Sequence, residues 1–306
     1  MEGIKYGRKA SGIKKELNEV IDKWVASIDD ENLRKLVCDN VIVTGGSICS
    51  MLMGDSVNDY DIYFTTKETA IKVAQYYMSK HFNINCVVKY GDDFSFDEDD
   101  AIDNERIAMF NFVREYKCEN IRGEIEERVE CFIASTGVSD NTEVNSTDEN
   151  GAYRVSYISS NAITLTDNIQ IIIRFFGTPD QIHNNYDFAH AKCYFDYAEQ
   201  HLHLDPHAMQ CMLSRTLIYE GSLYPIASVF RMKKFIERGW RISAGQQLKI
   251  MWQISELNLN DMKVLKEQLT GVDMLYLHCL FDAISKSGKD VDSQYVSKII
   301  DRIFEE

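Results

Sequence analysis

The chain has 306 residues, a hydrophobic content of 45% and a formal net charge of −15. This length and composition predict a globular protein of two domains, and the excess of acids argues against a broad nucleic-acid-binding surface, which would need many Lys and Arg side chains. No apolar run reaches the roughly 18 residues of a membrane helix, and the N-terminus lacks an apolar signal core, so we expect a cytoplasmic protein without membrane contact. The Cys residues are scattered singly, so we expect reduced thiols.

The first part of the chain alternates helices and strands around a glycine turn. Apolar residues at helical spacing predict a helix over 14–28, and Asp29 opens a second one. The following elements are predicted in order: a buried strand over 41–43, a Gly-Gly-Ser turn over 45–47, a short apolar helix over 48–53 and a strand over 59–64. Thr66 is placed to cap a helix over 67–82.

Two polar insertions interrupt the strands that come next. Strands are predicted over 84–90, 108–113 and 129–134. Between them, residues 92–105 include eight acids but lack the glycine and final acid of a calcium loop, so we expect a solvated insertion. Residues 135–152 are polar and predict a second surface excursion.

The rest of the chain changes from strands to helices. Residues rich in β-branched and aromatic side chains predict strands over 153–159, 161–166, 169–175 and 187–196, with a short helix after Thr178. Long helical patterns then occupy 207–221, 227–240, 244–257 and 272–286. This order predicts an α+β fold with one domain over 1–200 and a helical domain over 201–306.

The glycine turn and the strand after it carry the chemistry of the sequence. Adjacent glycines expose backbone N–H groups, and Ser47 stands at a helix N-terminus, where phosphate oxygens bind; a plain strand-to-helix connection is the alternative. Asp59 and Asp61 lie two residues apart, so they share one face of a strand. Their mutual repulsion is costly unless a cation such as Mg²⁺ lies between them, the alternative being an edge strand with two solvated acids.

These residues resemble the signature of the nucleotidyltransferase superfamily that includes DNA polymerase β. The match is nearest in motif to the tRNA CCA-adding and poly(A) polymerase branch, through Gly45-Gly46, Leu52 with Gly54, and Asp59-x-Asp61. That branch often has an arginine–aspartate pair after the glycines, whereas here Ile48 to Met51 follow, so the contacts of that pair do not carry over. The phrases IQIIIRF and YDFAHAK are also similar to uncharacterised nucleotidyltransferase-like proteins of large viruses.

The resemblance implies a nucleotidyltransferase-fold mixed sheet with flanking helices, followed by an α-helical domain. It implies transfer of a nucleoside monophosphate from an NTP, expected to be ATP, to an acceptor hydroxyl with release of pyrophosphate. Asp59 and Asp61 would bind two Mg²⁺ ions, with Mn²⁺ as an alternative, and Gly45, Gly46 and Ser47 would bind phosphates. A third acid is expected among Glu130, Asp167 and Asp187, of which Asp187 is favoured because it opens a strand after a helix; the alternative is that Asp187 is only a helix-to-strand turn residue.

The acceptor stays open among an RNA 3′ end, a protein hydroxyl and a small molecule, and the negative charge favours the last two. An inactive nucleotide-binding or protein-interaction module of the same fold is the alternative to an enzyme. The two readings differ in whether a third carboxylate accompanies Asp59 and Asp61.

Two further clusters lie in the second half of the chain. A basic stripe on one helix face could hold phosphates or form a solvated face, and comprises Arg231, Lys234, Arg238 and Arg241. Trp240 beside it is expected in the core. His201, His203 and His207 surround Asp205-Pro206, which reads as a helix start rather than part of a zinc site.

Overall fold

The computed structural model describes residues 7–91, 111–120, 122–133, 138–139, 153–259 and 261–268. The acidic insertion over 92–105, the helix predicted over 272–286 and nearly all of 135–152 lie outside the described residues. The chain forms two compact units, Met1–Ser214 and Arg215–Glu306. Sheets and helices occur in both units, so the predicted α+β class is confirmed.

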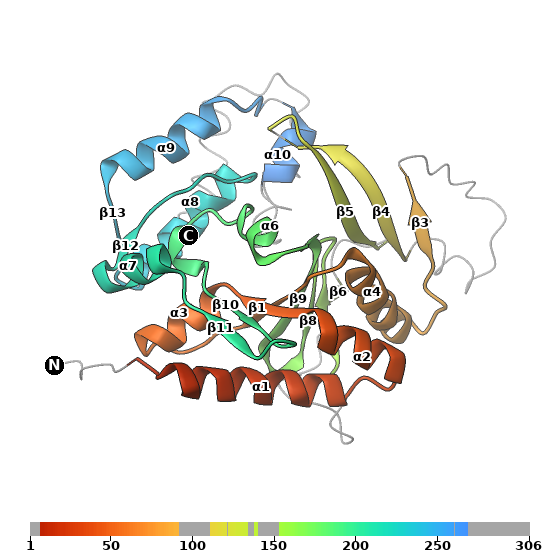
Figure 1. Ribbon diagram of the computed structural model, residues 1–306. Helices are drawn as coiled ribbons and strands as arrows, with labels where there is room; N and C mark the ends of the chain where they lie inside the picture. The colour runs from red at the N-terminus through yellow and green to blue at the C-terminus, as the bar shows by residue number, and fades with distance from the viewer. Residues whose placement is uncertain are drawn as a thin grey trace. The chain divides into compact units, whose positions relative to one another are not determined.

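The first unit is built on a mixed eight-stranded sheet (Figure 1). Its strand order is β11-β10-β1-β2-β9-β8-β7-β6. The strands are β1 (Val41–Thr44), β2 (Tyr60–Phe64), β6 (Val138–Ser139), β7 (Val155–Ile158), β8 (Ala162–Leu165), β9 (Ile169–Phe176), β10 (Tyr194–Asp196) and β11 (His201–His203). β2 pairs antiparallel with β1 and parallel with β9, so both of its edges are occupied.

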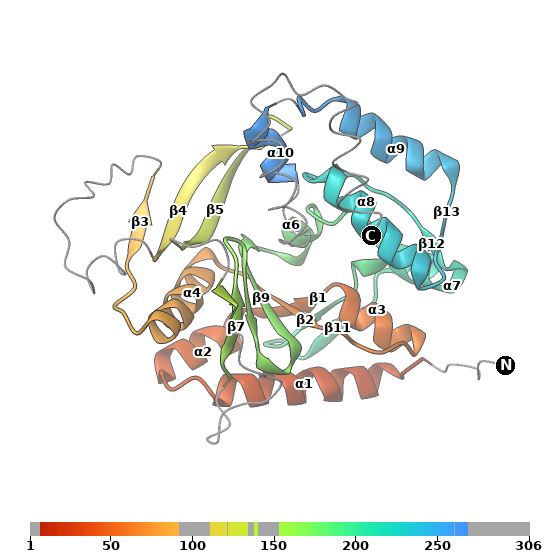
Figure 2. The same cartoon turned by 180° about the vertical axis from the view of Figure 1, so that it is seen from behind.

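Helices cover the two faces of this sheet. The helices of the first unit are α1 (Ala10–Ala26), α2 (Glu31–Asn40), α3 (Gly46–Met53), α4 (Lys67–Phe82), α6 (Pro179–His183) and α7 (Pro206–Ser214), with short 3-10 turns η1 (Thr166–Asn168) and η2 (Ala189–Ala191). α1, α2 and α4 lie along one side of the sheet, and α6 lies on the other (Figures 1 and 2). On the α6 side, Ile182 packs against Ile42 and Tyr63. Ile42 and Tyr63 are buried on this side, whereas Ile172 and Tyr194 are only partly buried, so the α6 side is covered incompletely.

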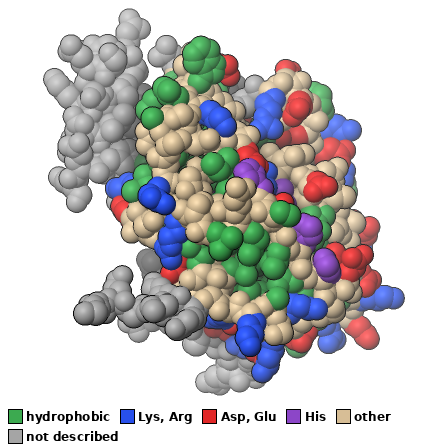
Figure 3. All heavy atoms as spheres, turned by 60° about the vertical axis from the view of Figure 1, so that its left-hand side comes forward, with side chains coloured by type: hydrophobic (Ala, Val, Ile, Leu, Met, Phe, Trp, Pro, Cys, Tyr) green, Lys and Arg blue, Asp and Glu red, His purple; other side chains and the backbone are tan. Residues whose placement is uncertain are grey.

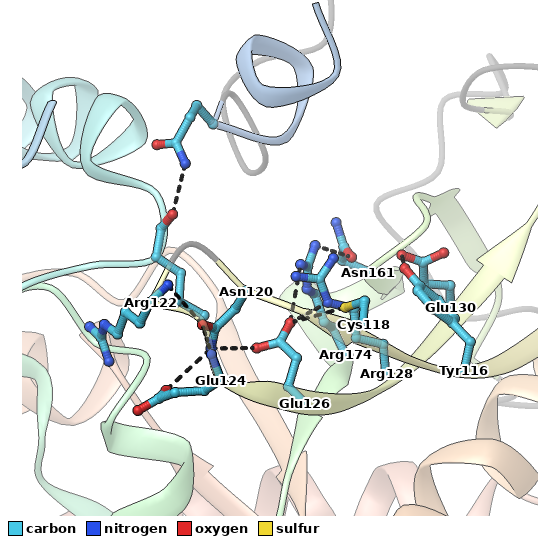
Figure 4. A network of polar contacts seen from close by, with 12 residues as sticks. Tyr116, Cys118, Asn120, Arg122, Glu124, Glu126, Arg128, Glu130, Asn161 and Arg174 are labelled. Atoms are coloured by element: carbon cyan, nitrogen blue, oxygen red, sulfur yellow. Dashed lines mark hydrogen bonds and ion pairs between the residues drawn. The ribbon is translucent and has the colours of Figure 1, made fainter. Parts of the chain in front are cut away.

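A second, three-stranded sheet of the first unit is linked to the eight-stranded sheet by a polar network. It contains β3 (Val88–Tyr90), β4 (Phe112–Glu119) and β5 (Ile125–Phe132) in that order. Arg128 of β5 and Arg174 of β9 both converge on the Glu126 carboxylate, and Arg174 also donates a 3.2 Å hydrogen bond to Asn161 (Figure 4). Both guanidinium groups are almost fully buried, so they need this shared carboxylate to offset the cost of burial.

The second unit is mainly helical in its described part. It contains α8 (Pro225–Glu237), α9 (Ala244–Ser255) and α10 (Met262–Gln268), and a short parallel pair of β12 (Thr216–Leu217) with β13 (Arg241–Ile242). Gln253 of α9 accepts a 2.6 Å hydrogen bond from the Tyr219 hydroxyl and donates a 2.7 Å bond to the carbonyl of Ser222. Trp240 is 4% exposed and packs edge-on against Phe235, which confirms its predicted core position.

Some of the helices and strands predicted from the sequence agree with the structure, and others do not. The Thr66 hydroxyl accepts a hydrogen bond from the backbone of Thr69 and caps α4, as predicted. The predictions of one strand over 187–196 and one helix over 207–221 are wrong. The first segment turns through η2 and only its last residues form β10, whereas the second ends its helix at Ser214 because Arg215 adopts a left-handed φ of 47°.

Candidate active site

The glycine turn lies against the carboxylate of Asp61. Gly45 adopts φ 91° and ψ −149° between β1 and α3, a conformation that side chains strongly disfavour. A Cβ atom at this position would lie 2.7 Å from Oδ2 of Asp61 and 3.4 Å from the hydroxyl of Tyr186. The Gly45 N–H donates a 3.2 Å hydrogen bond to the carbonyl of Ala191. The turn is therefore fixed in place, and only glycine leaves room for the carboxylate.

Asp61 is a carboxylate held in an environment that disfavours its charge. It lies in β2, in the interior of the eight-stranded sheet, and Asp59 immediately precedes the strand. Burial and then the nearby Asp59 charge raise the pKa of Asp61 to about 8. The edge-strand interpretation of these acids is wrong, because β2 pairs on both sides. A cation beside both carboxylates would remove the cost, which makes the pair suited to metal binding.

A hydrogen-bond relay fixes the strand end that precedes the turn. Thr44 is fully buried, and its hydroxyl lies 2.9 Å from the carbonyl of Cys193 and 2.8 Å from Nε2 of His183. The hydroxyl has one proton and the carbonyl can only accept, so the His183 ring donates its Nε2–H to Thr44. Burial lowers the pKa of His183 to about 4, which keeps the ring neutral. This relay ties β1 to α6 and to the segment before β10.

Ser47 supplies a buried polar group at the start of α3. Its side chain is 1% exposed, and its hydroxyl has no hydrogen-bond partner among the described residues. An unsatisfied buried hydroxyl costs roughly 1–3 kcal/mol, so a polar ligand at this place would remove a real penalty. Together with the free N–H groups of a helix N-terminus, the hydroxyl forms a suitable receptor for phosphate oxygens.

The three candidates for a third acid occupy different surroundings. Glu130 accepts a hydrogen bond from Tyr116 within the β4–β5 hairpin, at the right of Figure 4. Asp167 adopts a left-handed φ of 56° in the β8–β9 turn and pairs with Lys23 at 2.5 Å. Asp187 is 8% exposed and lies on the loop after α6, directly after Tyr186 and near His190. Its role as third acid stays a prediction, although it does not open a strand as expected.

Among the described residues, no three side chains of His, Cys, Asp or Glu come together in an arrangement that could hold a metal ion. Asp205 caps α7 by accepting a 2.6 Å hydrogen bond from the backbone N–H of Ala208, as its sequence position predicts.

The basic stripe belongs to the second unit. Arg231 and Lys234 lie on α8, Arg238 follows its end, and Arg241 lies in β13. Three of the four are exposed, namely Lys234, Arg238 and Arg241. Their proposed role in phosphate binding is untested by this arrangement.

Sequence reasoning missed the residues that support the turn. Thr44 lies far along the chain from His183 and Tyr186, and the packing of α6 and the residues after it against the sheet brings them together. The one local signal was the short helix after Thr178, whose last residue is His183.

A comparison with known protein families identifies the chain. The model described as "Gad2: Gabija anti-defense 2 family protein" matches residues 15–215, more than half of the 306 residues. The chain belongs to the Gabija anti-defense 2 family. Both β2 with its acids and the turn at Gly45 lie inside the matched region.

The sequence identity between this chain and a curated member of the family is low. A curated protein named Gabija anti-defense 2, from Bacillus phage SPbetaL7, is 25% identical over 140 residues, which cover 44% of this chain and 34% of that protein. The match thus spans about a third of the relative's length.

Similar solved structures include a tRNA-processing enzyme with CTP and the CCA-adding enzyme of Thermotoga maritima in complex with tRNA. The first has 9% identity and a TM-score of 0.34, and the similarity covers 87% of this chain and 54% of that one. The second has 12% identity and a TM-score of 0.36, covering 93% and 69%. At TM-scores this low, the likenesses establish nothing about the activity of this chain.

Proposed function

We propose that this protein is a metal-dependent nucleotidyltransferase. The observation that carries the proposal is the closeness of the glycine turn to the carboxylate of Asp61, whose pKa is raised. An ideal Cβ built on Gly45 would lie 2.7 Å from Oδ2 of Asp61. If the N–H groups of the turn bind phosphate and the Asp61 carboxylate binds a metal, this arrangement would bring the two together, as transfer from a nucleoside triphosphate requires. The buried hydroxyl of Ser47, which has no hydrogen-bond partner in the described part of the chain, supports a ligand at the same place.

In the proposed reaction, the acceptor oxygen bonds to the α-phosphorus of an NTP, for which ATP is the first candidate. The bond to the β-phosphate breaks, and pyrophosphate leaves with the bonding electrons. Asp59 and Asp61 would hold the divalent metal, Mg²⁺ or Mn²⁺, which would stabilise the charge on the phosphates. Gly45, Gly46 and Ser47 orient the β- and γ-phosphates, and Asp187 is the candidate for taking the acceptor's proton. Arg231, Lys234 and Arg238 are candidates for further phosphate contacts.

The acceptor is proposed to be a protein or a small molecule rather than long RNA. The net charge of −15 supports this choice, as does the interspersed arrangement of acidic and basic side chains on the face in Figure 3. No helix among the described residues is long and apolar enough to cross a membrane. Following the name of its family, we further propose that the transfer serves to counter the Gabija defence.

Incubation of the protein with each α-labelled NTP, Mg²⁺ and a cell lysate tests the proposal. We expect one class of lysate species to acquire label from the wild type and none from Asp61→Ala or Asp59→Ala. Equal labelling by the wild type and a folded Asp61→Ala protein would refute the proposed site. Labelling by neither, with tight Mg²⁺-dependent ATP binding, would instead favour an inactive nucleotide-binding module.

A further inference from the structure

The sheet position beside Asp61 is occupied by Gln170. Strand register places Gln170 of β9 directly opposite Asp61 of β2, with Thr44 opposite Asp61 on the other side and Thr164 opposite Gln170. Residues directly opposite one another on paired strands project to the same face. The register therefore builds one polar row, Thr44–Asp61–Gln170–Thr164, across four neighbouring strands.

This row lies on the face of the sheet that α6 covers. Two residues further along the same strands, Ile42, Tyr63 and Ile172 belong to the cluster around Ile182 of α6. Residues two apart on a strand share a face, so the polar row shares this one. The hydroxyl of Tyr186, which follows α6, approaches the Gly45 position at the same place. Gln170 thus faces the candidate active site and not the side covered by α1 and α4.

A glutamine at this position limits the charge that the site can hold. Adjacent strands lie about 4.8 Å apart, so side chains at positions 61 and 170 can reach one ion. The amide of Gln170 offers a carbonyl oxygen or an N–H donor but no negative charge. Two divalent ions held close together need several carboxylates to offset their charge, whereas one ion bound with a triphosphate needs only one or two.

We propose that the site binds a single divalent ion with the nucleotide, and that the carbonyl oxygen of Gln170 acts as a neutral ligand beside Asp61. The proposal rests on the nucleotidyltransferase function proposed above, and it replaces the two-ion site that the sequence predicts. Asp187 lies outside the row, on the loop between α6 and η2. Gln170 is then a residue that sets metal number and affinity.

Counting bound Mn²⁺ tests this inference without measuring activity. Mn²⁺ is titrated into the full chain with an equimolar non-hydrolysable ATP analogue, and bound ions are counted by electron paramagnetic resonance. We expect one ion per complex for the wild type. Q170E adds a carboxylate at the key position, so it should bind a second ion or bind the first about tenfold more tightly. T164E, one strand further along the row, is the matched control and should behave as the wild type.

Each outcome decides a different point. Two ions in the wild-type complex, or identical titrations for folded Q170E and T164E, would overturn the single-ion inference while leaving the proposed function intact. The triphosphate of the analogue binds Mn²⁺ by itself, so Mn²⁺ binding no tighter with protein than with the analogue alone, in every variant including the wild type, would overturn both. Circular dichroism melts show whether each variant is folded, and the wild-type count stands even if Q170E does not fold.

Discussion

Replacing Asp61 by Asn should make the metal-free protein more stable at neutral and alkaline pH. The folded-state pKa of Asp61 is raised from 3.8 to about 8, because burial and the Asp59 charge disfavour the ionised form. Above pH 4 the unfolded chain ionises this carboxyl freely, whereas the folded chain does so at a cost. The wild type therefore loses stability as the pH rises from about 4 towards 8, and the loss then levels off. Asparagine keeps the shape of the side chain and removes the charge.

The shift in pKa sets a ceiling on the size of this effect. At about 1.4 kcal/mol per pKa unit, a rise from 3.8 to about 8 corresponds to at most about 6 kcal/mol. The Asp61 side chain is partly exposed, so solvent screening reduces the cost, and we expect roughly 2–3 kcal/mol at pH 8. At pH 4.5 the variant and the wild type should differ by under about 1 kcal/mol.

Differential scanning calorimetry with a chelator, between pH 4.5 and 9, measures this difference and separates the two compact units if they melt apart. Adding Mg²⁺ and ATP should then stabilise the wild type and leave Asp61→Asn almost unchanged. Asp59→Asn is the comparison variant, since Asp59 is exposed and its charge is the second cause of the raised pKa of Asp61, so its replacement should give a smaller stabilisation. A variant less stable than the wild type at pH 8 without metal would show that the carboxylate makes stabilising contacts, and would refute the reasoning.

Three other substitutions separate structural from ligand-binding roles. Gly45→Ala places a Cβ 2.7 Å from Asp61 Oδ2 at a positive φ and should lower the free energy of unfolding by about 1–3 kcal/mol. A Cβ at position 46 would have nothing within 4 Å, so Gly46→Ala should leave the free energy of unfolding nearly unchanged. Thermal denaturation compares the two variants. Ser47→Ala should leave stability unchanged or slightly higher but weaken ATP binding measured by calorimetry, and unchanged ATP affinity would remove Ser47 from the site. Thr44→Val should cost about 2–4 kcal/mol in urea denaturation, because it leaves two buried hydrogen-bonding groups without their partner; a loss under about 0.5 kcal/mol would contradict the relay.

The centre of the site was predictable because its signals are local. The Gly-Gly-Ser turn, the apolar strand before it and the acids at 59 and 61 lie within a short stretch whose order already implies strand, turn, helix and strand. The cap at Thr66 and the start of α7 at Asp205 follow equally from neighbouring residues.

The surroundings of the site depend on strand pairing between distant segments. Nothing local shows that Gln170 will lie opposite Asp61, or that His183 will reach Thr44. Likewise, the pairing of Asp167 with Lys23 of α1 depends on how a turn packs against a helix. Spacing alone can thus suggest an acid as a metal ligand, but only tertiary contacts fix the partner of that acid.

The central claim, nucleotidyl transfer at Asp59 and Asp61, is tested most directly by comparing two positions of the label in ATP. The protein is incubated with Mg²⁺, lysate and ATP that carries the label at either the α- or the γ-phosphate. We predict that the α-label becomes attached to an acceptor while the γ-label is released in pyrophosphate, and that Asp61→Asn abolishes both. Attachment of the γ-label to an acceptor, or undiminished α-labelling by folded Asp61→Asn, would contradict the claim.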